Sequence, residues 1–234
     1  LHLLSRRQRQ MCIRDSNMNI KKYLNISKVC MEINSTYTSP EIFKKCYTSL
    51  EGIEQKSLIT HVIIKNIPYL FRDKPLLFEQ IIQYLSDSLD IEGESIKLIG
   101  SAKTGFSVSP PPCYGKKFSD KSDLDFTIIN NTLFDKLENE YQSWKDAYID
   151  RIVFPKSETA KRYWDDNVLQ LKNTINRGFI DTNKIPNIEI CPTTKKINNA
   201  MYLIPLKLKE YHDITTSKAS VSCLLYTSPS PRDM

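Results

Sequence analysis

The chain has 234 residues, of which 40% are hydrophobic and 26% charged, with 33 basic and 27 acidic side chains. This length suffices for one sizeable core with a helical appendage. An apolar run near the ~20 residues of a membrane-spanning helix is absent, so we expect no membrane partner. The cysteines are widely spaced, without a Cys-x-x-Cys pair, which argues against a zinc site or a secreted disulfide framework and favours a cytoplasmic protein.

Both ends of the chain resemble translated adapters from sequencing-library preparation. We interpret residues 1–16, with Met-Cys-Ile-Arg-Asp near their end, and residues 223–234, with Leu-Leu-Tyr-Thr-Ser-Pro-Ser-Pro-Arg-Asp, as such artefacts. The alternative is a natural basic arm and a Ser-Pro tail. Met18 is then the expected start, and the natural C-terminus is expected beyond Ser222. The remaining residues include 28 basic and 25 acidic side chains, so net charge alone does not indicate a nucleic-acid partner.

Residues 17–74 are expected to form a mostly helical N-terminal region. A helix is predicted to begin at Pro40, because proline suits the first turn and Ser39 can cap it. The run 61–64 fits either a strand or the end of a helix. A longer helix is expected from Pro75, where apolar residues recur at helical spacing.

Two carboxylates lie at alternate positions in the middle of the chain. Asp123 and Asp125 open an apolar run at 126–129 that reads as a strand, and on a strand alternate side chains share a face. Adjacent carboxylates repel each other unless a cation lies between them, and Mg²⁺ accepts oxygen ligands while leaving positions open for phosphates. The alternative is a strand with two solvated aspartates, but aspartate is unfavourable in strands. The pair therefore predicts a site for Mg²⁺ or Mn²⁺.

A second short apolar run, 96–99, ends in Gly100 and Ser101. Glycine lets the backbone approach a phosphate, and the serine hydroxyl and amide can bind it. Together with the carboxylate pair, this turn suggests nucleotidyl transfer. Lys103 and Thr104 follow the turn and are candidates for contacts with the β- or γ-phosphate, although a loop lysine is more often solvated.

The later part of the domain, 75–222, is predicted to be mainly helical. Asn130 is expected to cap a helix that runs to about residue 150, and 156–177 reads as further helix with Trp164 in the core rather than as a base-stacking platform. The run 187–191, between two prolines, is a candidate strand. These elements predict an α/β (α+β) fold with a single mixed sheet and helices packed on it.

The Gly-Ser turn followed by Asp-x-Asp resembles the signature of the polymerase-beta superfamily of nucleotidyltransferases. The resemblance covers residues 75–192, and its specific part is 96–129. One departure is the 21 residues that separate Ser101 from Asp123, which we interpret as an insertion at 102–121 that shapes the substrate entrance. Its lysines are candidates for holding an anionic acceptor, or are simply solvated; they are Lys116, Lys117 and Lys121.

The resemblance implies a polymerase-beta-like fold in which Asp123 and Asp125 bind Mg²⁺ (or Mn²⁺) and the Gly-Ser turn holds the phosphates of an NTP. It also implies a third carboxylate, for which Glu189 is favoured over Asp181 because the apolar neighbours of Glu189 point to the opposite face of its expected strand. Lys195 and Lys196, after that strand, are weaker candidates for a phosphate contact; their alternative is solvation.

By analogy alone, the chain could be a stand-alone bacterial enzyme that makes a nucleotide signal or modifies RNA. The sequence leaves the acceptor open among RNA, a nucleotide, a protein and a small molecule. The competing hypothesis is a non-catalytic module that binds nucleotide or RNA. The intact Gly-Ser and Asp-x-Asp motifs favour the enzyme.

Overall fold

The computed structural model describes residues 26–33, 35–185, 191–211 and 214–224. The chain divides into two compact units between Val62 and Ile63, earlier than the boundary after residue 74 expected from the sequence. The sheet and all candidate site residues lie in the second unit.

The first unit is helical in its described part, as expected. It contains η1 (Cys30–Glu32), α3 (Pro40–Ser49) and α4 (Gly52–Ile59). The predicted start of α3 is confirmed, because Ser39 Oγ accepts a hydrogen bond of 3.3 Å from the Ile42 amide. Residues 61–64, which fitted either a strand or the end of a helix, lie in the π-helix η2 (Thr60–Lys65), which spans the division.

The second unit holds the remaining elements, which follow in chain order. They are η3 (Tyr69–Phe71), α5 (Pro75–Leu89), η4 (Gly93–Ser95), β1 (Ile96–Ile99), α6 (Gly100–Thr104), β2 (Leu124–Ile128), α7 (Asn131–Ile149), α8 (Glu158–Tyr163), η5 (Trp164–Val168), η6 (Leu169–Leu171), α9 (Lys172–Ile175), β3 (Phe179–Asp181), α10 (Pro192–Leu208) and β4 (Ala219–Leu224). Within the described residues, none of the helices combines the length and the apolar character required to cross a membrane.

The four strands form one mixed sheet in the order β1-β2-β4-β3, which confirms the expected single mixed sheet. β1 and β2 are antiparallel, β2 and β4 parallel, and β4 and β3 antiparallel. Phe126 pairs with Leu98 on β1 and with Val221 on β4, so one apolar row crosses three strands. All three of these side chains are buried.

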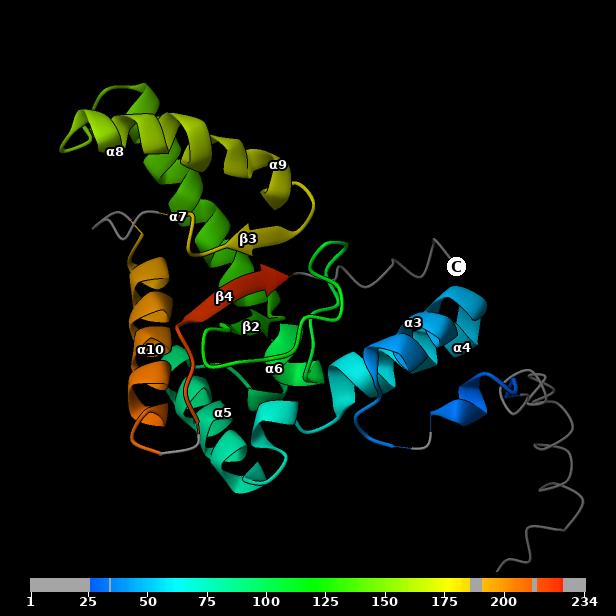
Figure 1. The fold of residues 1–234 in the computed structure, drawn as a ribbon. Helices are drawn as coiled ribbons and strands as arrows, with labels where there is room; N and C mark the ends of the chain where they lie inside the picture. Colours follow the sequence, from blue (N-terminus) through cyan, green and yellow to red (C-terminus); the bar gives the residue numbers. More distant parts are fainter. Residues whose placement is uncertain (1–25, 34, 186–190, 212–213, 225–234) are drawn as a thin grey trace, which may run out of the picture. The chain divides into compact units, whose positions relative to one another are not determined.

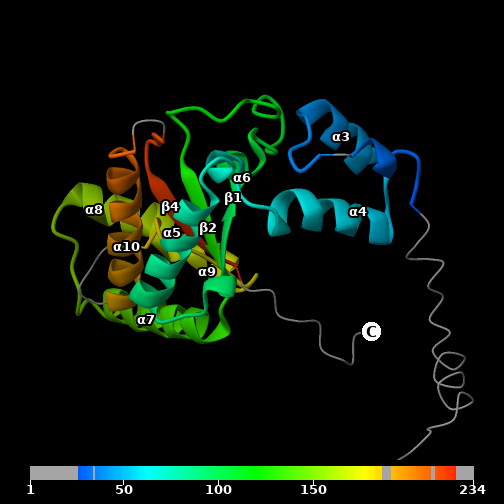
Figure 2. The same cartoon turned by 90° about the horizontal axis from the view of Figure 1, so that it is seen from below.

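Two helices cover this apolar face of the sheet. α5 and α10 lie side by side against it, and α10 also contacts α7 (Figures 1 and 2). α5 follows the predicted spacing and buries Ile81, Leu85 and Leu89. α10 buries Ile197 and Ile204 on its sheet side. The core therefore lies between one helical layer and one face of the sheet.

The later helices agree in part with the sequence. α7 begins as predicted, with Asn130 Oδ1 accepting a hydrogen bond of 2.8 Å from the Leu133 amide. The expected long helix over 156–177 is divided into the shorter elements α8 to α9. Trp164 is a core residue, as predicted, and its ring packs edge-on against Trp144 at a centroid distance of 5.3 Å.

The third and fourth strands lie where no strand was expected. The candidate strand at 187–191 falls almost entirely outside the described residues. β3 instead occupies Phe179–Asp181, for which the sequence analysis predicted no strand. β4 reaches two residues into the adapter-like segment: the backbones of Cys223 and Leu224 pair with β3, and Cys223 also pairs with Ile128 of β2. Residues 1–16 and 225–234 lie outside the described residues.

Candidate active site

Four chain segments meet at one edge of the sheet. Because β1 and β3 run antiparallel to β2 and β4, the ends of the first two strands lie beside the starts of the other two. This edge carries Gly100 after β1, Asp123 before β2, Lys218 before β4, and Asp181 at the end of β3. The topology thus gathers both motifs singled out in the sequence.

Gly100 and Asp125 lie in direct contact. Ile99 is the register partner of Asp125, which places the Gly-Ser turn beside the carboxylate. A Cβ atom at Gly100 would lie 2.4 Å from Asp125 Oδ2, and Gly100 has a φ of +69°. Both the space and the backbone conformation therefore require glycine here. The structure brings together the two halves of the predicted site.

Asp125 has a fixed partner on the neighbouring strand. Ser220, its register partner on β4, donates a hydrogen bond of 2.8 Å from Oγ to Asp125 Oδ1. Asp125 is half-buried, and Oδ2 is the oxygen that faces Gly100. The contact with Ser220 orients the carboxylate without neutralising its charge.

Asp123 has a hydroxyl and an ammonium group beside it. Ser217 donates a hydrogen bond from Oγ to Asp123 Oδ1, and Lys218 Nζ lies 3.5 Å from Asp123 Oδ2. The Lys218 and Asp123 side chains are 69% and 34% exposed, so this ion pair contributes at most about 1 kcal/mol. Lys218 offsets part of the negative charge of Asp123. A ligand that displaces the lysine loses only the small free energy of this exposed ion pair.

The Ser101 hydroxyl makes no hydrogen bond within the part of the chain that the structure describes. Ser101 is half-buried in α6, next to Gly100. Its carbonyl accepts a hydrogen bond of 2.9 Å from the Gly105 amide, which closes the short helix. The hydroxyl is therefore available to a ligand at the sheet edge.

Lys103 and Thr104, the two candidates for further phosphate contacts, are engaged elsewhere. Lys103 is 4% exposed, and Nζ donates hydrogen bonds to the carbonyls of Asn66 and, at 3.5 Å, of Ile64. Burial, with a smaller contribution from Lys97, lowers the pKa of Lys103 to about 8. The Thr104 hydroxyl donates to the carbonyls of Gly100 and Phe106. Both side chains hold the turn together, and we do not place them in the site.

The insertion at 102–121 contains a short hairpin. The Ser107 amide donates to the Lys116 carbonyl at 2.8 Å, and the Gly115 amide donates to the Ser107 carbonyl at 2.9 Å. Phe106 is buried beneath it and forms an isolated bridge with Lys117. The insertion lysines are exposed, as are Lys195 and Lys196 on α10; the insertion lysines are Lys116, Lys117 and Lys121.

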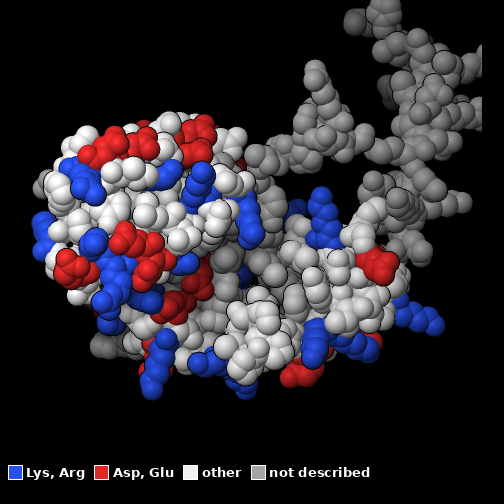
Figure 3. Space-filling view, turned by 90° about the horizontal axis from the view of Figure 1, so that it is seen from above, with Lys and Arg blue, Asp and Glu red and all other residues white. Residues whose placement is uncertain are grey.

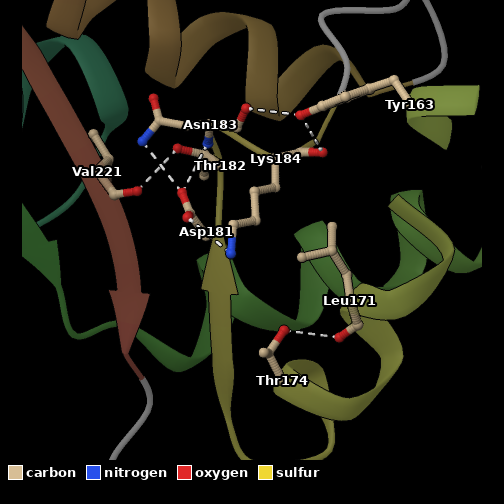
Figure 4. A network of polar contacts seen from close by, with 8 residues as sticks. All are labelled: Tyr163, Leu171, Thr174, Asp181, Thr182, Asn183, Lys184 and Val221. Carbon is tan, nitrogen blue, oxygen red and sulfur yellow. Dashed lines mark hydrogen bonds and ion pairs between the residues drawn. The ribbon is translucent and has the colours of Figure 1, made fainter. Parts of the chain in front are cut away.

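The favoured third carboxylate, Glu189, lies outside the described residues. Its competitor Asp181 is described, and its Oδ1 accepts hydrogen bonds from the amide and the side chain of Asn183, at 3.1 and 3.2 Å (Figure 4). Lys184 Nζ lies 3.9 Å from the other oxygen. Asp181 lies on β3, which β4 separates from β2, and its carboxylate is engaged by Asn183 and Lys184.

Among the described residues, no three His, Cys, Asp or Glu side chains gather closely enough to hold a metal ion. The oxygen ligands that the described residues offer at this edge are therefore those of Asp123 and Asp125, with their serine partners. On the face shown in Figure 3, described basic and acidic side chains are interspersed rather than gathered in one basic patch. The charged groups beside Asp123 and Asp125 therefore say more about a possible ligand than the net charge of the chain does.

Sequence reasoning missed the partners supplied by β4 and by the two residues before it. Ser217, Lys218 and Ser220 lie in a segment rich in serine and threonine that resembles a linker. The one available signal was the alternation of Ser220, Val221 and Ser222, which is typical of a half-buried strand. It extends over too few residues to have predicted a strand beside Asp125.

Comparison with known protein families, with curated proteins and with solved structures finds no match to this chain.

Proposed function

We propose that this chain is a Mg²⁺-dependent nucleotidyltransferase that moves a nucleoside monophosphate from an NTP to a hydroxyl acceptor. The observation that carries the proposal is the contact between Gly100 and Asp125, where an added Cβ would lie 2.4 Å from the carboxylate. A turn that lets a phosphate approach its backbone and a carboxylate that can hold a cation are adjacent at one sheet edge. The mixed sheet with helices on one face is compatible with the polymerase-beta-like fold that we propose for residues 75–222.

The residues present fit a hard divalent cation. Asp123 and Asp125 provide oxygen ligands, which Mg²⁺ and Mn²⁺ prefer. Breaking the exposed ion pair between Lys218 and Asp123 costs little free energy, so a cation can replace the lysine. Such a cation, when bound, lowers the pKa of an acceptor hydroxyl and neutralises charge on the phosphate oxygens. Glu189 remains our proposed third ligand.

The protein's own groups have separate roles in this proposal. The backbone at Gly100 and the Ser101 hydroxyl hold NTP phosphates, while Ser220 keeps the Asp125 carboxylate oriented. The acceptor hydroxyl attacks the α-phosphorus, the bond to the β-phosphate oxygen breaks, and pyrophosphate leaves. Electrostatic positioning of this kind supplies most of the catalysis in phosphoryl transfer.

Pyrophosphate release tests the proposal. The full 234-residue chain is incubated with each NTP, Mg²⁺ and cell-extract acceptors, and compared with Asp125→Asn and with the control Asp120→Asn, an exposed aspartate of the insertion loop. We expect release by the wild type and by the control, and none by Asp125→Asn. Nucleotide binding without release for every NTP would instead indicate the non-catalytic binding module.

A further inference from the structure

A cavity of about 410 Å³ lies at the β1 side of the sheet, between α5 and this edge strand. Its volume is within the range of small-molecule sites. The apolar part of its wall includes Phe78, Ile82 and Leu98, and neither Asp123 nor Asp125 lines it. All of its lining residues belong to the second unit. We refer to it as the β1 cavity.

One side chain in the wall of the β1 cavity is a buried lysine. Lys103 is 4% exposed, and its Nζ donates hydrogen bonds to the carbonyls of Asn66 and, at 3.5 Å, of Ile64. Both of these residues also line the cavity. Within the part of the chain that the structure describes, Lys103 forms no ion pair with a carboxylate. The two carbonyls therefore hold Nζ at the cavity wall without neutralising its charge.

The hydrogen bonds of Lys103 suit its neutral form. An ammonium group has three N–H donors, but only two carbonyls accept from Lys103 among the described residues. The neutral amine has two N–H donors, so it keeps both hydrogen bonds and still has a lone pair. Burial, and to a smaller extent the charge of Lys97, lower the pKa of Lys103 to about 8. Near that pH, about half of the molecules carry a nucleophilic amine at the wall of the cavity.

The charged groups of the lining favour an anionic ligand beside this amine. Lys97 on β1 is half-buried and Lys65 is exposed, and neither forms an ion pair within the described ranges. The acidic residues of the lining, Glu79 and Glu94, are both exposed. Water screens exposed charges more than half-buried ones, so an anion gains more from Lys97 than it loses to the two glutamates.

We propose that Lys103 forms a Schiff base with a small anionic aldehyde bound in the β1 cavity. Lys97 attracts the anionic group, the apolar wall covers the carbon skeleton, and the lone pair of Lys103 Nζ attacks the carbonyl carbon. The C–N bond forms, the carbonyl oxygen leaves as water with the two hydrogens of the amine, and an imine remains. Protonation of the imine by solvent restores one N–H donor for a wall carbonyl. The step consumes no oxidant or reductant, and it is independent of nucleotidyl transfer.

The first test uses pyridoxal 5′-phosphate, an aldehyde that carries a phosphate group. The full chain is incubated with this probe at about pH 7.5, reduced with borohydride and digested, and the labelled lysines are mapped by mass spectrometry. We expect Lys103 to be labelled at least about 10-fold faster than Lys116, an exposed lysine of the insertion, because the lowered pKa of Lys103 leaves more neutral amine than an ordinary lysine has. The label is mapped on the wild type, so the test requires no variant at Lys103. Equal rates, or labelling of exposed lysines only, would overturn the proposal.

A second test addresses the anionic group of the ligand. Labelling of Lys103 by the phosphate ester is compared with labelling by pyridoxal, which lacks the phosphate, in the wild type, in Lys97→Met and in the control Lys117→Met, an exposed lysine outside the cavity. Loss of the Lys97 charge changes the reactivity of Lys103 toward both probes, so their ratio isolates the contact with phosphate. We expect this ratio to fall by about 3-fold in Lys97→Met and to stay unchanged in the control. An unchanged ratio in Lys97→Met would overturn the assignment of an anionic ligand.

Discussion

The same strands present apolar side chains on one face of the sheet and polar side chains on the other. On one face, Leu124, Phe126 and Val221 are buried beneath α5 and α10. On the other, Asp125 and Ser220 are half-buried and bonded to each other. Because side chains alternate along a strand, neighbouring residues such as Asp125 and Phe126 serve chemistry and stability separately. Substitutions on the two faces should therefore be distinguishable by what they change.

The largest effect is expected on the polar face. Asp123→Asn or Asp125→Asn removes a charge that a cation requires while keeping nearly the same shape, so transfer should fall by roughly 1000-fold or more. The folded state should remain, because loss of carboxylate repulsion offsets the weakened contacts. Pyrophosphate release and thermal unfolding measure the two effects. Wild-type turnover in either variant would remove that aspartate from the site.

The matching change on the apolar face is Phe126→Ala. Phe126 is 0% exposed in the centre of the sheet, so its removal should lower the free energy of unfolding by about 3–5 kcal/mol. Urea unfolding gives this value, with Phe126→Leu as the milder control. Activity per folded molecule is expected to change little. A loss of activity without a loss of stability would contradict the division between the faces.

Gly100→Ala tests the point at which the two motifs meet. Its Cβ would collide with Asp125 Oδ2 in a backbone conformation with φ of +69°. We expect a loss of roughly 1–3 kcal/mol in stability together with a loss of transfer. Gly52→Ala is the control, because Gly52 has a similar φ of +56° but nothing within 4 Å of the added Cβ. Equal activity in the two variants would show that the Gly100 contact is not needed.

Lys103 lies on neither face of the sheet. Its lowered pKa predicts that the stability of the protein depends on pH. Its pKa is lowered by burial to about 8, below the ordinary value of 10.5, so the unfolded chain binds more protons between these values. Stability from this group therefore rises with pH from about 8 to 10.5, by on the order of 1 kcal/mol after allowance for the polar surroundings. Lys103→Met should lack this rise, and the exposed Lys116→Met should retain it. Identical pH profiles for the wild type and Lys103→Met would contradict the assignment.

Local sequence patterns predicted those features of the fold that depend on residues near one another in the chain. The caps at Ser39 and Asn130, the helix from Pro75 and the burial of Trp164 each follow from residues nearby. β3 and β4 were missed because their pairing depends on residues far away along the chain. β3 has only three residues, too few for a periodic signal.

The candidate site shows the same limit. Alternation placed Asp123 and Asp125 on one face, but the contact with Gly100 depends on the antiparallel register of β1 and β2. The hydrogen bond from Ser220 to Asp125 depends on β4. The engagement of Lys103 by the carbonyls of Ile64 and Asn66 was likewise invisible, because those residues lie well before it in the chain.

Metal binding tests the central claim, that Asp123 and Asp125 form a cation site, most directly. Mn²⁺ binding to the full chain is measured by electron paramagnetic resonance for the wild type, Asp125→Asn and the control Asp120→Asn. The account predicts a bound Mn²⁺ in the wild type and the control, and an affinity lowered by about 10-fold or more in Asp125→Asn. Equal Mn²⁺ affinity in all three proteins would contradict it.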